Sequence, residues 1–340
     1  MMRSEQYPDH FLNNWFVACA SKDLKAKPLG CMVFDIPVVI ARLKGVSRAF
    51  LDRCPHRNVY LSRGKLVNGA LKCPYHGWEF DHEGLCVRVP GLVGPSKHKT
   101  RALEPIDCLE VDGFIWVSVG NGPITNAPPI PSGSWKGRRH TFFWCTQVQG
   151  DIANVIENFL DPTHTHFVHS GLIRRDKSRH CVTAVVRPKR NSVEVEYPDE
   201  GKQKGIISTF FERNRETSFG RYIYPSTAEI EYCSSDGTSI LISAHFSPSK
   251  DDSVRIHATT IVRGGSIIGI LKQAAIWPFF RLSLEQDRKI IDNQYENINC
   301  FGKEKFTSTE LDLVGPHLRK LIKQGPIDKD ARSHTVEINL

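Results

Sequence analysis

The sequence predicts an α+β protein of two domains, an all-β sandwich followed by an antiparallel sheet flanked by helices. The chain has 340 residues, which suits two domains of ~150 residues each. Short β-like runs broken by turns fill the part from Trp15 to Val119. Strand-like runs grouped between two helical segments fill most of the remainder, and that grouping is typical of α+β proteins.

Turn signals divide the first part of the chain into short strands. Apolar runs such as Cys31–Ile40 and Gly113–Val119 predict strands. Turns at this spacing are typical of an antiparallel sandwich. The dipeptides that separate the runs are Lys44-Gly45, Asn68-Gly69, Glu83-Gly84 and Pro90-Gly91.

A stretch rich in proline, glycine and asparagine follows, Gly120–Gly133. Its prolines lack a backbone N–H and favour extended backbone, which suits a linker. We therefore expect a first domain over residues 1–120, a linker over 121–134 and a second domain over 135–340.

The second domain is expected to begin and end with helices. Ile152, Val155, Ile156 and Phe159 share one helical face within Asp151–Leu160. A second helix is expected from about Leu284 to Cys300. The strand-like runs between the helices are Val182–Val186, Ser192–Tyr197, Ile206–Phe211, Thr227–Tyr232, Ser239–Phe246 and Val254–Val262.

Composition and charge exclude several classes of protein. The chain is 40% hydrophobic and 24% charged, which is ordinary for a globular protein. Its net charge is +8, but the basic residues form no long run and no nucleic-acid motif accompanies them. Ten cysteines are too few for a disulfide scaffold, and the polar first residues are unlike a secretory signal. We expect a cytoplasmic protein that binds no nucleic acid.

The most apolar stretch is Gly264–Phe280, interrupted by Lys272, Gln273 and Pro278. It falls short of the ~20 apolar residues of a membrane span. We expect a buried segment or a lid over a cavity. A peripheral membrane contact is the less favoured alternative, so a membrane is not an expected partner.

Two short loops carry the first candidate metal site. Cys54-Pro55-His56 is followed by Cys73-Pro74-Tyr75-His76, so each loop offers one thiolate and one imidazole. This donor set fits either zinc or a Rieske 2Fe–2S cluster. Zinc motifs usually pair Cys with Cys and His with His, so the mixed loops favour the cluster. Gly77 permits a positive φ beside it. Trp78 is equally a core aromatic or a neighbour of the cluster.

A second dense group of candidates ends the first predicted helix. It contains Asp161, His164, His166 and His169. Two histidines and a carboxylate can hold Fe(II) while leaving positions open for O₂ and substrate. His164 and His169 are five residues apart, so both can bind one ion only where the helix is broken or strained. A histidine-rich helix end without a metal is the alternative.

Both groups of residues resemble those of a known family. Cys54-Pro-His-Arg57 and Cys73-Pro-Tyr-His-Gly-Trp78 are similar to the two Rieske signature loops. The pattern Asn158-x2-Asp161-x2-His164-x4-His169 resembles the iron-binding motif of Rieske non-haem iron oxygenases, the group that includes vanillate and dicamba demethylases.

The resemblance implies a role for each matching residue. Cys54, His56, Cys73 and His76 would hold the 2Fe–2S cluster. His164 and His169 would bind mononuclear Fe(II), with His166 left out. Asp287 is the matching third ligand, with Glu285, Asp292 and Glu296 as rivals. Asp161 would link His164 to His76 of a neighbouring subunit, and Asn158 would lie near the iron without binding it.

The resemblance also implies fold, activity and partners. The first domain would be a Rieske sandwich and the second a helix-grip cavity. The chain would be the catalytic subunit of an oxygenase, usually a homotrimer, that hydroxylates, demethylates or dihydroxylates a small organic substrate, and an aromatic one is expected. An NAD(P)H-dependent reductase or a ferredoxin would supply the electrons. Asn158, Phe159, His245 and Asn293 are candidate pocket residues.

Two other functions remain as hypotheses. One is a Rieske electron-transfer protein fused to a ligand-binding module, which would lack the second iron. The other is a zinc-stabilised interaction protein, which the mixed Cys-His loops disfavour. The basic residues around the cluster loops predict an acidic electron donor: Arg53, Arg57, Arg63, Lys65 and Lys72.

Overall fold

The computed structural model describes residues 6–96, 98–124, 126–198, 200, 205–207, 215–326 and 332–340. The chain divides into two compact units. Unit 1 comprises Met1–Pro128 and Ser247–Asp251, and unit 2 comprises Pro129–Phe246 and Asp252–Leu340. The boundary at Pro128 lies inside the segment 121–134 that was expected to be a linker.

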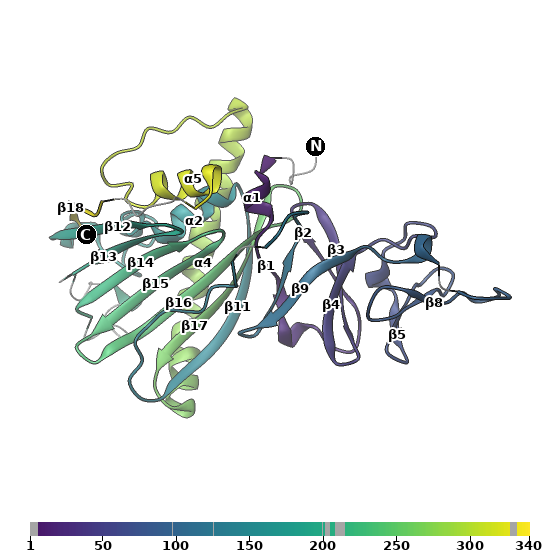
Figure 1. Ribbon diagram of the computed structural model, residues 1–340. Helices are drawn as coiled ribbons and strands as arrows, with labels where there is room; N and C mark the ends of the chain where they lie inside the picture. The colour runs from purple at the N-terminus through teal and green to yellow at the C-terminus, as the bar shows by residue number, and fades with distance from the viewer. Residues whose placement is uncertain are drawn as a thin grey trace. The chain divides into compact units, whose positions relative to one another are not determined.

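Unit 1 is built on two antiparallel sheets, as the sequence predicted. The larger has the order β1-β10-β9-β4-β3-β2 and the smaller the order β5-β6-β7-β8 (Figure 1). The strands of the larger sheet are β1 Phe16–Ala20, β2 Leu29–Val33, β3 Ile36–Leu43, β4 Val46–Leu51, β9 Pro105–Val111 and β10 Phe114–Ser118. Those of the smaller are β5 Lys65–Val67, β6 Ala70–Lys72, β7 Glu79–Phe80 and β8 Cys86–Arg88. A short helix, α1 Asp9–Leu12, precedes them.

The predicted turns explain where these strands end. The glycine of each predicted dipeptide has a positive φ: Gly45, Gly69, Gly84 and Gly91. One strand prediction was wrong, because Cys31–Ile40 covers the end of β2 and most of β3. The two strands are joined at Phe34 and Asp35, which both have positive φ. Neither residue is a glycine, so the sequence did not predict this turn, and the buried Phe34 resembles a strand residue.

Unit 2 is centred on a long sheet with the order β11-β17-β16-β15-β14-β13-β12-β18. Alternation along β13 places Val193, Val195 and Tyr197 on the buried face, as expected for a half-covered sheet. The strands are β11 Arg139–Gln149, β12 Cys181–Lys189, β13 Ser192–Tyr197, β14 Thr217–Ile223, β15 Thr227–Ser234, β16 Gly237–Pro248, β17 Ser253–Arg263 and β18 His334–Asn339. The sequence did not single out β11, β14 or β18.

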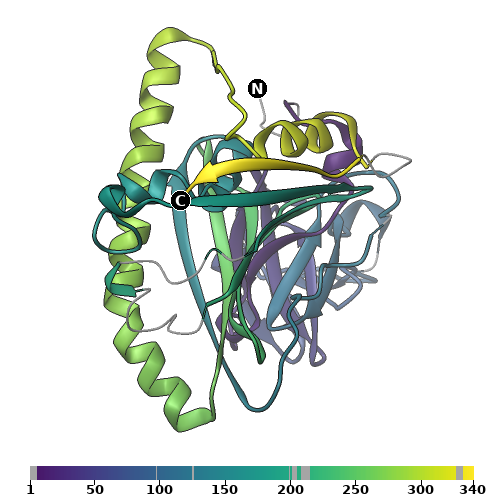
Figure 2. The same ribbon diagram turned by 90° about the vertical axis from the view of Figure 1, so that its left-hand side faces the viewer.

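Helices cover the sheet of unit 2. Helix α2, Ile152–Leu160, packs on β14 and β15, while α5, Gly315–Gln324, packs on β13. The long helix α4, Ser266–Phe301, runs beside β11 and is seen at full length in Figure 2. The predicted helix over Asp151–Leu160 is confirmed, with the Asp151 carboxylate accepting from the Ala153 N–H at 2.8 Å as its N-cap.

The second predicted helix was placed too late in the chain. Helix α4 begins at Ser266 rather than near Leu284 and continues through Pro278. The expectation that Gly264–Phe280 is buried was also wrong for its outer side, because Ile267 and Leu271 are exposed. Its inner side does line a cavity. The predicted strand Ile206–Phe211 lies mostly outside the described residues.

Candidate metal centres

Each cluster loop is a tight turn that follows a strand. Cys54 comes after β4, and its N–H donates to the Val59 carbonyl at 3.0 Å. Cys73 comes directly after β6, and its N–H donates to the Trp78 carbonyl at 2.8 Å. Gly77 has a φ of 69°, the left-handed conformation that the sequence predicted for this position. The two loops therefore have similar backbone geometry.

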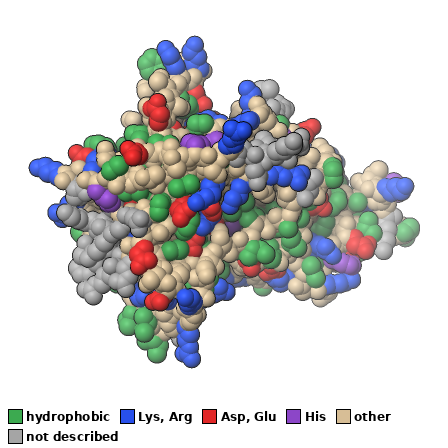
Figure 3. Space-filling model, turned by 60° about the vertical axis from the view of Figure 1, so that its left-hand side comes forward, with side chains coloured by type: hydrophobic (Ala, Val, Ile, Leu, Met, Phe, Trp, Pro, Cys, Tyr) green, Lys and Arg blue, Asp and Glu red, His purple; other side chains and the backbone are tan. Residues whose placement is uncertain are grey.

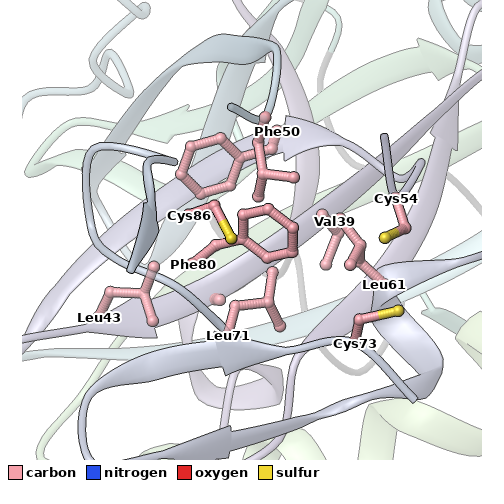
Figure 4. Packing of buried hydrophobic residues seen from close by; sticks show 11 residues of the cluster. Val39, Leu43, Phe50, Cys54, Leu61, Leu71, Cys73, Phe80 and Cys86 are labelled. Carbon is pink, nitrogen blue, oxygen red and sulfur yellow. The ribbon is translucent and has the colours of Figure 1, made fainter. Parts of the chain in front are cut away.

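The two thiols and the two imidazoles differ in exposure. Cys54 and Cys73 are buried and lie at one end of the hydrophobic core of unit 1, beside Val39 and Leu61 (Figure 4). His56 is half-buried and His76 is exposed, with their ring centroids 4.5 Å apart. A group held by all four would be anchored in the core on its thiolate side and reach solvent on its histidine side.

Trp78 supports the histidine side of this site. Its ring stacks on His56 with centroids 4.7 Å apart and an interplanar angle of 6°. It also packs against the core of unit 1. Of the two interpretations left open by the sequence, both apply, because Trp78 is a core aromatic that orients a candidate ligand.

The spacing of the four donor atoms tests whether the two cluster loops fit a single metal ion. Burial raises the pKa of the Cys54 thiol, so a bound cation is needed to keep it as a thiolate at neutral pH. A tetrahedral zinc with bonds of ~2.0–2.3 Å would hold its donors within about 4 Å of one another. Among the described residues, only His164, His169 and Asp287 form such a compact group of donors. Cys54, His56, Cys73 and His76 are more widely spread, which suits a binuclear cluster better than zinc.

The second site forms where α2 ends. Asp161 is the C-cap of α2, with φ −76° and ψ 117°, and Pro162 follows it. A short 3-10 turn, His164–His166, comes next. The helix is thus broken before the histidines, which meets the condition that the spacing of His164 and His169 imposed.

Three side chains converge at this break. His164 Nε2 and His169 Nε2 are 3.4 Å apart. Asp287 Oδ1, from α4, lies 3.3 Å from the former and 3.0 Å from the latter. Donors bound to one ion at ~2.1 Å in adjacent positions lie about 3 Å apart, so the three atoms fit one metal ion. Asp287 Oδ1 is buried without a hydrogen-bond donor, as a metal-binding oxygen would be.

Hydrogen bonds outside the triad orient its rings. His169 Nδ1 donates to Gln286 Oε1 at 2.9 Å, which leaves the Nε2 lone pair for a metal. His164 Nδ1 lies 3.5 Å from Asp161 Oδ2. Asp161 is held in turn by the Thr163 N–H at 2.7 Å and the His164 N–H at 3.2 Å. Nothing in the sequence distinguished Gln286 as a supporting residue.

Electrostatics favour a cation between these groups. Burial lowers the pKa of His164, but the facing carboxylates of Asp161 and Asp287 outweigh it and raise the pKa to about 9. The pKa of Asp287 lies below its usual value despite burial, because His164 and His169 face it. A metal ion would therefore compete with a proton for His164.

The residues that were alternative candidates for the metal ligands lie outside the triad. His166 is buried, and its Nδ1 donates to the Thr163 carbonyl at 3.3 Å, outside the triad. Glu285 pairs with Arg288 at 2.6 Å on the helix surface. Asp292 accepts from the Gln149 N–H at 3.3 Å, and Glu296 is exposed.

A cavity of about 150 Å³ opens beside the triad. Asn158, Phe159 and Asp161 line it, but neither His245 nor Asn293 does. His245 is buried in the sheet and donates to or accepts from Thr227 Oγ1 at 2.9 Å, while Asn293 is exposed. Most of the wall is apolar and includes Ile173, Ile230, Ile240, Ile242, Phe280 and Leu284.

One side of the cavity wall is charged. Arg174 and Arg215 both contact the carboxylate of Glu200, which is fully buried and also accepts from Ser218 Oγ. Arg215 lies over the ring of Tyr232, 4.2 Å from its centroid. Burial raises the pKa of Glu200, but the two arginines outweigh it and hold the pKa at about 2. No sequence pattern predicted this group, whose members come from separate segments.

Comparison with known proteins identifies the family of both parts of the chain. Residues 14–103 match the Rieske [2Fe-2S] domain, and residues 148–325 match the vanillate O-demethylase oxygenase C-terminal domain. The second match covers just over half of the chain. This chain belongs to the Rieske oxygenases of the vanillate O-demethylase type. The predicted family and the predicted fold class are thereby confirmed.

Several curated relatives are similar to this Rieske oxygenase chain. The dicamba O-demethylase oxygenase component of Stenotrophomonas maltophilia is 35% identical over 167 residues, covering 48% of this chain and 49% of the relative. The vanillate O-demethylase oxygenase subunit of Pseudomonas sp. (strain HR199 / DSM 7063) is 32% identical over 166 residues, covering 47% and 46%. The matches therefore span about half the length of these relatives.

Solved structures share the fold over a longer stretch. Dicamba monooxygenase bound to 3,6-dichlorosalicylic acid aligns with a TM-score of 0.77 at 21% identity, covering 93% of this chain and 97% of the other. A methylxanthine N1-demethylase of Pseudomonas putida with caffeine aligns with a TM-score of 0.75 at 19% identity, covering 96% and 99%. At these identities the likeness concerns the fold.

Proposed function

We propose that this chain is the catalytic component of an O₂-dependent oxygenase system. It would hydroxylate, demethylate or dihydroxylate a small aromatic molecule with electrons from a separate reductase or ferredoxin. The observation that carries the proposal is the convergence of His164, His169 and Asp287 at the wall of an apolar cavity. A chain with Rieske loops and this triad has a place for electron entry and a place for oxygen chemistry.

Each centre has its own proposed ligands. Cys54, His56, Cys73 and His76 would hold the 2Fe–2S cluster, and His164, His169 and Asp287 would hold mononuclear Fe(II). When bound, the two centres supply single-electron transfer and oxygen activation. The protein would contribute fixed ligand positions and a dry cavity.

Asp161 is the proposed link between the two centres. Its carboxylate faces His164 Nδ1 at 3.5 Å and is held by Thr163. Burial raises the pKa of Asp161, but His164 and the Thr163 donors outweigh it and leave the pKa below its usual value, so Asp161 stays an acceptor. We propose that it also accepts from the cluster histidine of a neighbouring subunit in a homotrimer, and that Asn158 positions substrate without binding iron.

The cavity supports a flat, largely apolar substrate. Its wall of isoleucine, leucine and phenylalanine would exclude water and pack against an aromatic ring. Relatives are named for dicamba, vanillate and methylxanthines, all of which contain such rings. We propose an aromatic or heteroaromatic substrate.

The partner would be an acidic electron donor that docks at the cluster loops. Arg53, Arg57, Arg63 and Lys65 are exposed there, whereas Lys72 is paired with Glu79 at 3.1 Å. Attraction between exposed charges weakens with salt. The complex would form in the cytoplasm, where a reductase and reduced thiols are available.

Substrate-dependent O₂ uptake tests the proposed function. Protein with both centres loaded is mixed with a generic reductase and screened with aromatic acids, methyl ethers, N-methyl compounds and sterols. At least one class should stimulate O₂ uptake and yield an oxidised product. Uptake should disappear in His169→Ala, whose cluster remains reducible. A reducible cluster without substrate-dependent uptake in any class would favour an electron carrier fused to a binding module.

A further inference from the structure

The first half of α4 presents an apolar face to solvent. Ile267 is 76% exposed, Ile268 57%, Ile270 55% and Leu271 65%. Four neighbouring exposed β-branched or leucine side chains are unusual on a soluble surface, where apolar residues are normally scattered. Figure 3 shows hydrophobic and Lys or Arg side chains together at the lower end, where Figure 1 places the first turns of α4.

Helical geometry gathers these residues into one stripe. At ~100° per residue, the exposed apolar residues fall on one side of α4. Exposed Lys272 borders the stripe on one side, and exposed Arg281 lies within the stripe near its other edge. The stripe consists of Ile267, Ile268, Ile270, Leu271, Ala274, Ala275, Pro278 and Leu282. Long basic side chains beside an apolar stripe are typical of helices that lie in a membrane interface.

The opposite side of the same helix is attached to β11. His140 Nε2 donates to Gln273 Oε1 at 2.8 Å. The ring of Phe280 lies 5.0 Å from that of Trp144, and Trp277 lies 6.4 Å from Phe142. By length and composition, residues 267–301 qualify as a membrane span, with only 11% of the most apolar window buried. Because its inner side holds the sheet, the helix can meet a bilayer with its stripe alone.

The charges around the stripe are strongly basic. No Asp or Glu occurs between Ser253 and Leu284. The residues at and just before the start of β11 add exposed basic side chains. The Arg138 side chain comes within 3.7 Å of the position that a Cβ on Gly265 would occupy. Asp236 pairs with Arg263 at 3.6 Å, and the net charge of the patch remains positive. The basic residues of this patch are Lys136, Arg138, Arg139, Arg263, Lys272 and Arg281.

We infer that this patch, the α4 stripe with its basic border, docks on the surface of a bilayer that contains anionic lipid. The stripe would enter the acyl–headgroup boundary, and the basic side chains would contact lipid phosphates. The chain would remain peripheral. This inference does not depend on the proposed oxygenase activity, because the patch shares no residue with either metal site.

Vesicle co-sedimentation of the full chain tests this inference. Vesicles are made from phosphatidylcholine alone or from phosphatidylcholine mixed with phosphatidylglycerol. We expect at least about tenfold more protein on the anionic vesicles, and a decrease as salt rises. Equal sedimentation in both lipids, or none in either, would overturn the inference.

Variants distinguish vesicle binding through the stripe from nonspecific adsorption of the protein. Ile267→Asn with Leu271→Asn, and separately Arg138→Glu with Arg139→Glu, should each reduce binding by about tenfold or more. The matched control is Ile130→Asn, since Ile130 is 78% exposed and lies outside the patch. The control should bind like the unaltered chain. Far-UV circular dichroism and thermal unfolding report correct folding of unit 2, which contains every one of these substitutions.

A second copy of the chain is the competing occupant of the stripe. Light scattering without lipid distinguishes it. The double asparagine variant should keep the oligomeric state of the unaltered chain. If that variant instead dissociates while vesicle binding is unchanged, the stripe is a subunit interface and the inference is wrong.

Discussion

The two proposed metal sites of this chain are built in contrasting ways. The proposed cluster site consists of two short turns, each holding a Cys and a His two or three residues apart, and its histidines are half-buried or exposed. The proposed iron site joins a broken helix end with Asp287 from a distant helix, and its ligands are buried or half-buried. A site meant to exchange electrons with a partner can lie at a surface, whereas oxygen chemistry needs enclosure.

The largest effect is expected from a cluster thiol. Cys73→Ser should abolish the visible absorption of the cluster, because a hydroxyl does not replace a thiolate ligand. The control is Cys86→Ser, since Cys86 is equally buried in the same core. Absorption and sulfide analysis would measure both. Loss of the cluster in Cys86→Ser alone would mean that the ligand assignment is wrong.

Next in size is the effect of a single iron ligand. His169→Ala should lose the mononuclear iron and at least about 1000-fold in turnover, while the cluster spectrum stays unchanged. His166→Ala is a demanding control, because His166 is buried nearby and outside the triad. It should retain iron. Iron analysis that showed the reverse pattern would exchange the roles of the two histidines.

The buried carboxylate near the proposed iron site and the carboxylate near the proposed cluster should contribute differently to the free energy of unfolding. Glu200→Ala leaves Arg174 and Arg215 buried without their carboxylate and should cost roughly 3–5 kcal/mol. Glu79→Ala, near the cluster, removes pairs with the more exposed Lys72 and Arg88 and should cost about 1 kcal/mol or less. Chemical denaturation measures both values. Equal losses of unfolding free energy in the two variants would contradict the difference in burial between the two sites.

The pH dependence of the Glu200 contribution has a defined sign. Its pKa is about 2 in the folded chain against an ordinary 4.5. A lowered pKa stabilises the fold above the unfolded value, so the contribution is complete above pH ~4.5 and is lost as the pH falls toward 2. The difference in stability between the unaltered chain and Glu200→Ala should therefore shrink in acid.

A smaller effect is expected from the amide that orients His169. Gln286→Leu removes the acceptor for His169 Nδ1 and should weaken Fe(II) or Co(II) binding about 10–100-fold. Glu285→Leu, next to it on the surface, should leave metal affinity unchanged. Metal titration of the cluster-loaded protein measures this directly. An unaffected affinity in Gln286→Leu would show that the ring is oriented by other contacts.

Sequence information sufficed where structure is local. The cluster turns, the positive φ of Gly77 and the helix broken after Leu160 follow from neighbouring residues. Asp287 was expected from family resemblance, because periodicity alone left Glu285, Asp292 and Glu296 as rivals. Gln286 and the Arg174–Glu200–Arg215 group were not predicted, since only tertiary packing brings them to the site.

The start of α4 shows another limit of local signals. Lys272 and Pro278 suggested an interrupted segment, yet the helix runs through both. Contacts of Trp277 and Phe280 with the sheet stabilise the helix there, so tertiary packing outweighs the local cost of proline. The exposure of Ile267 depends on which side of the helix meets the sheet, which the sequence does not specify.

Iron and acid-labile sulfide content, compared between the unaltered chain and Asp287→Ala, tests the presence of two independent centres most directly. The unaltered chain should contain about three iron ions and about two sulfides per chain. Asp287→Ala should contain about two of each, with an unchanged reduced-state EPR signal of the cluster. Unchanged iron in the variant, or loss of sulfide together with iron, would contradict a separate mononuclear site at His164, His169 and Asp287.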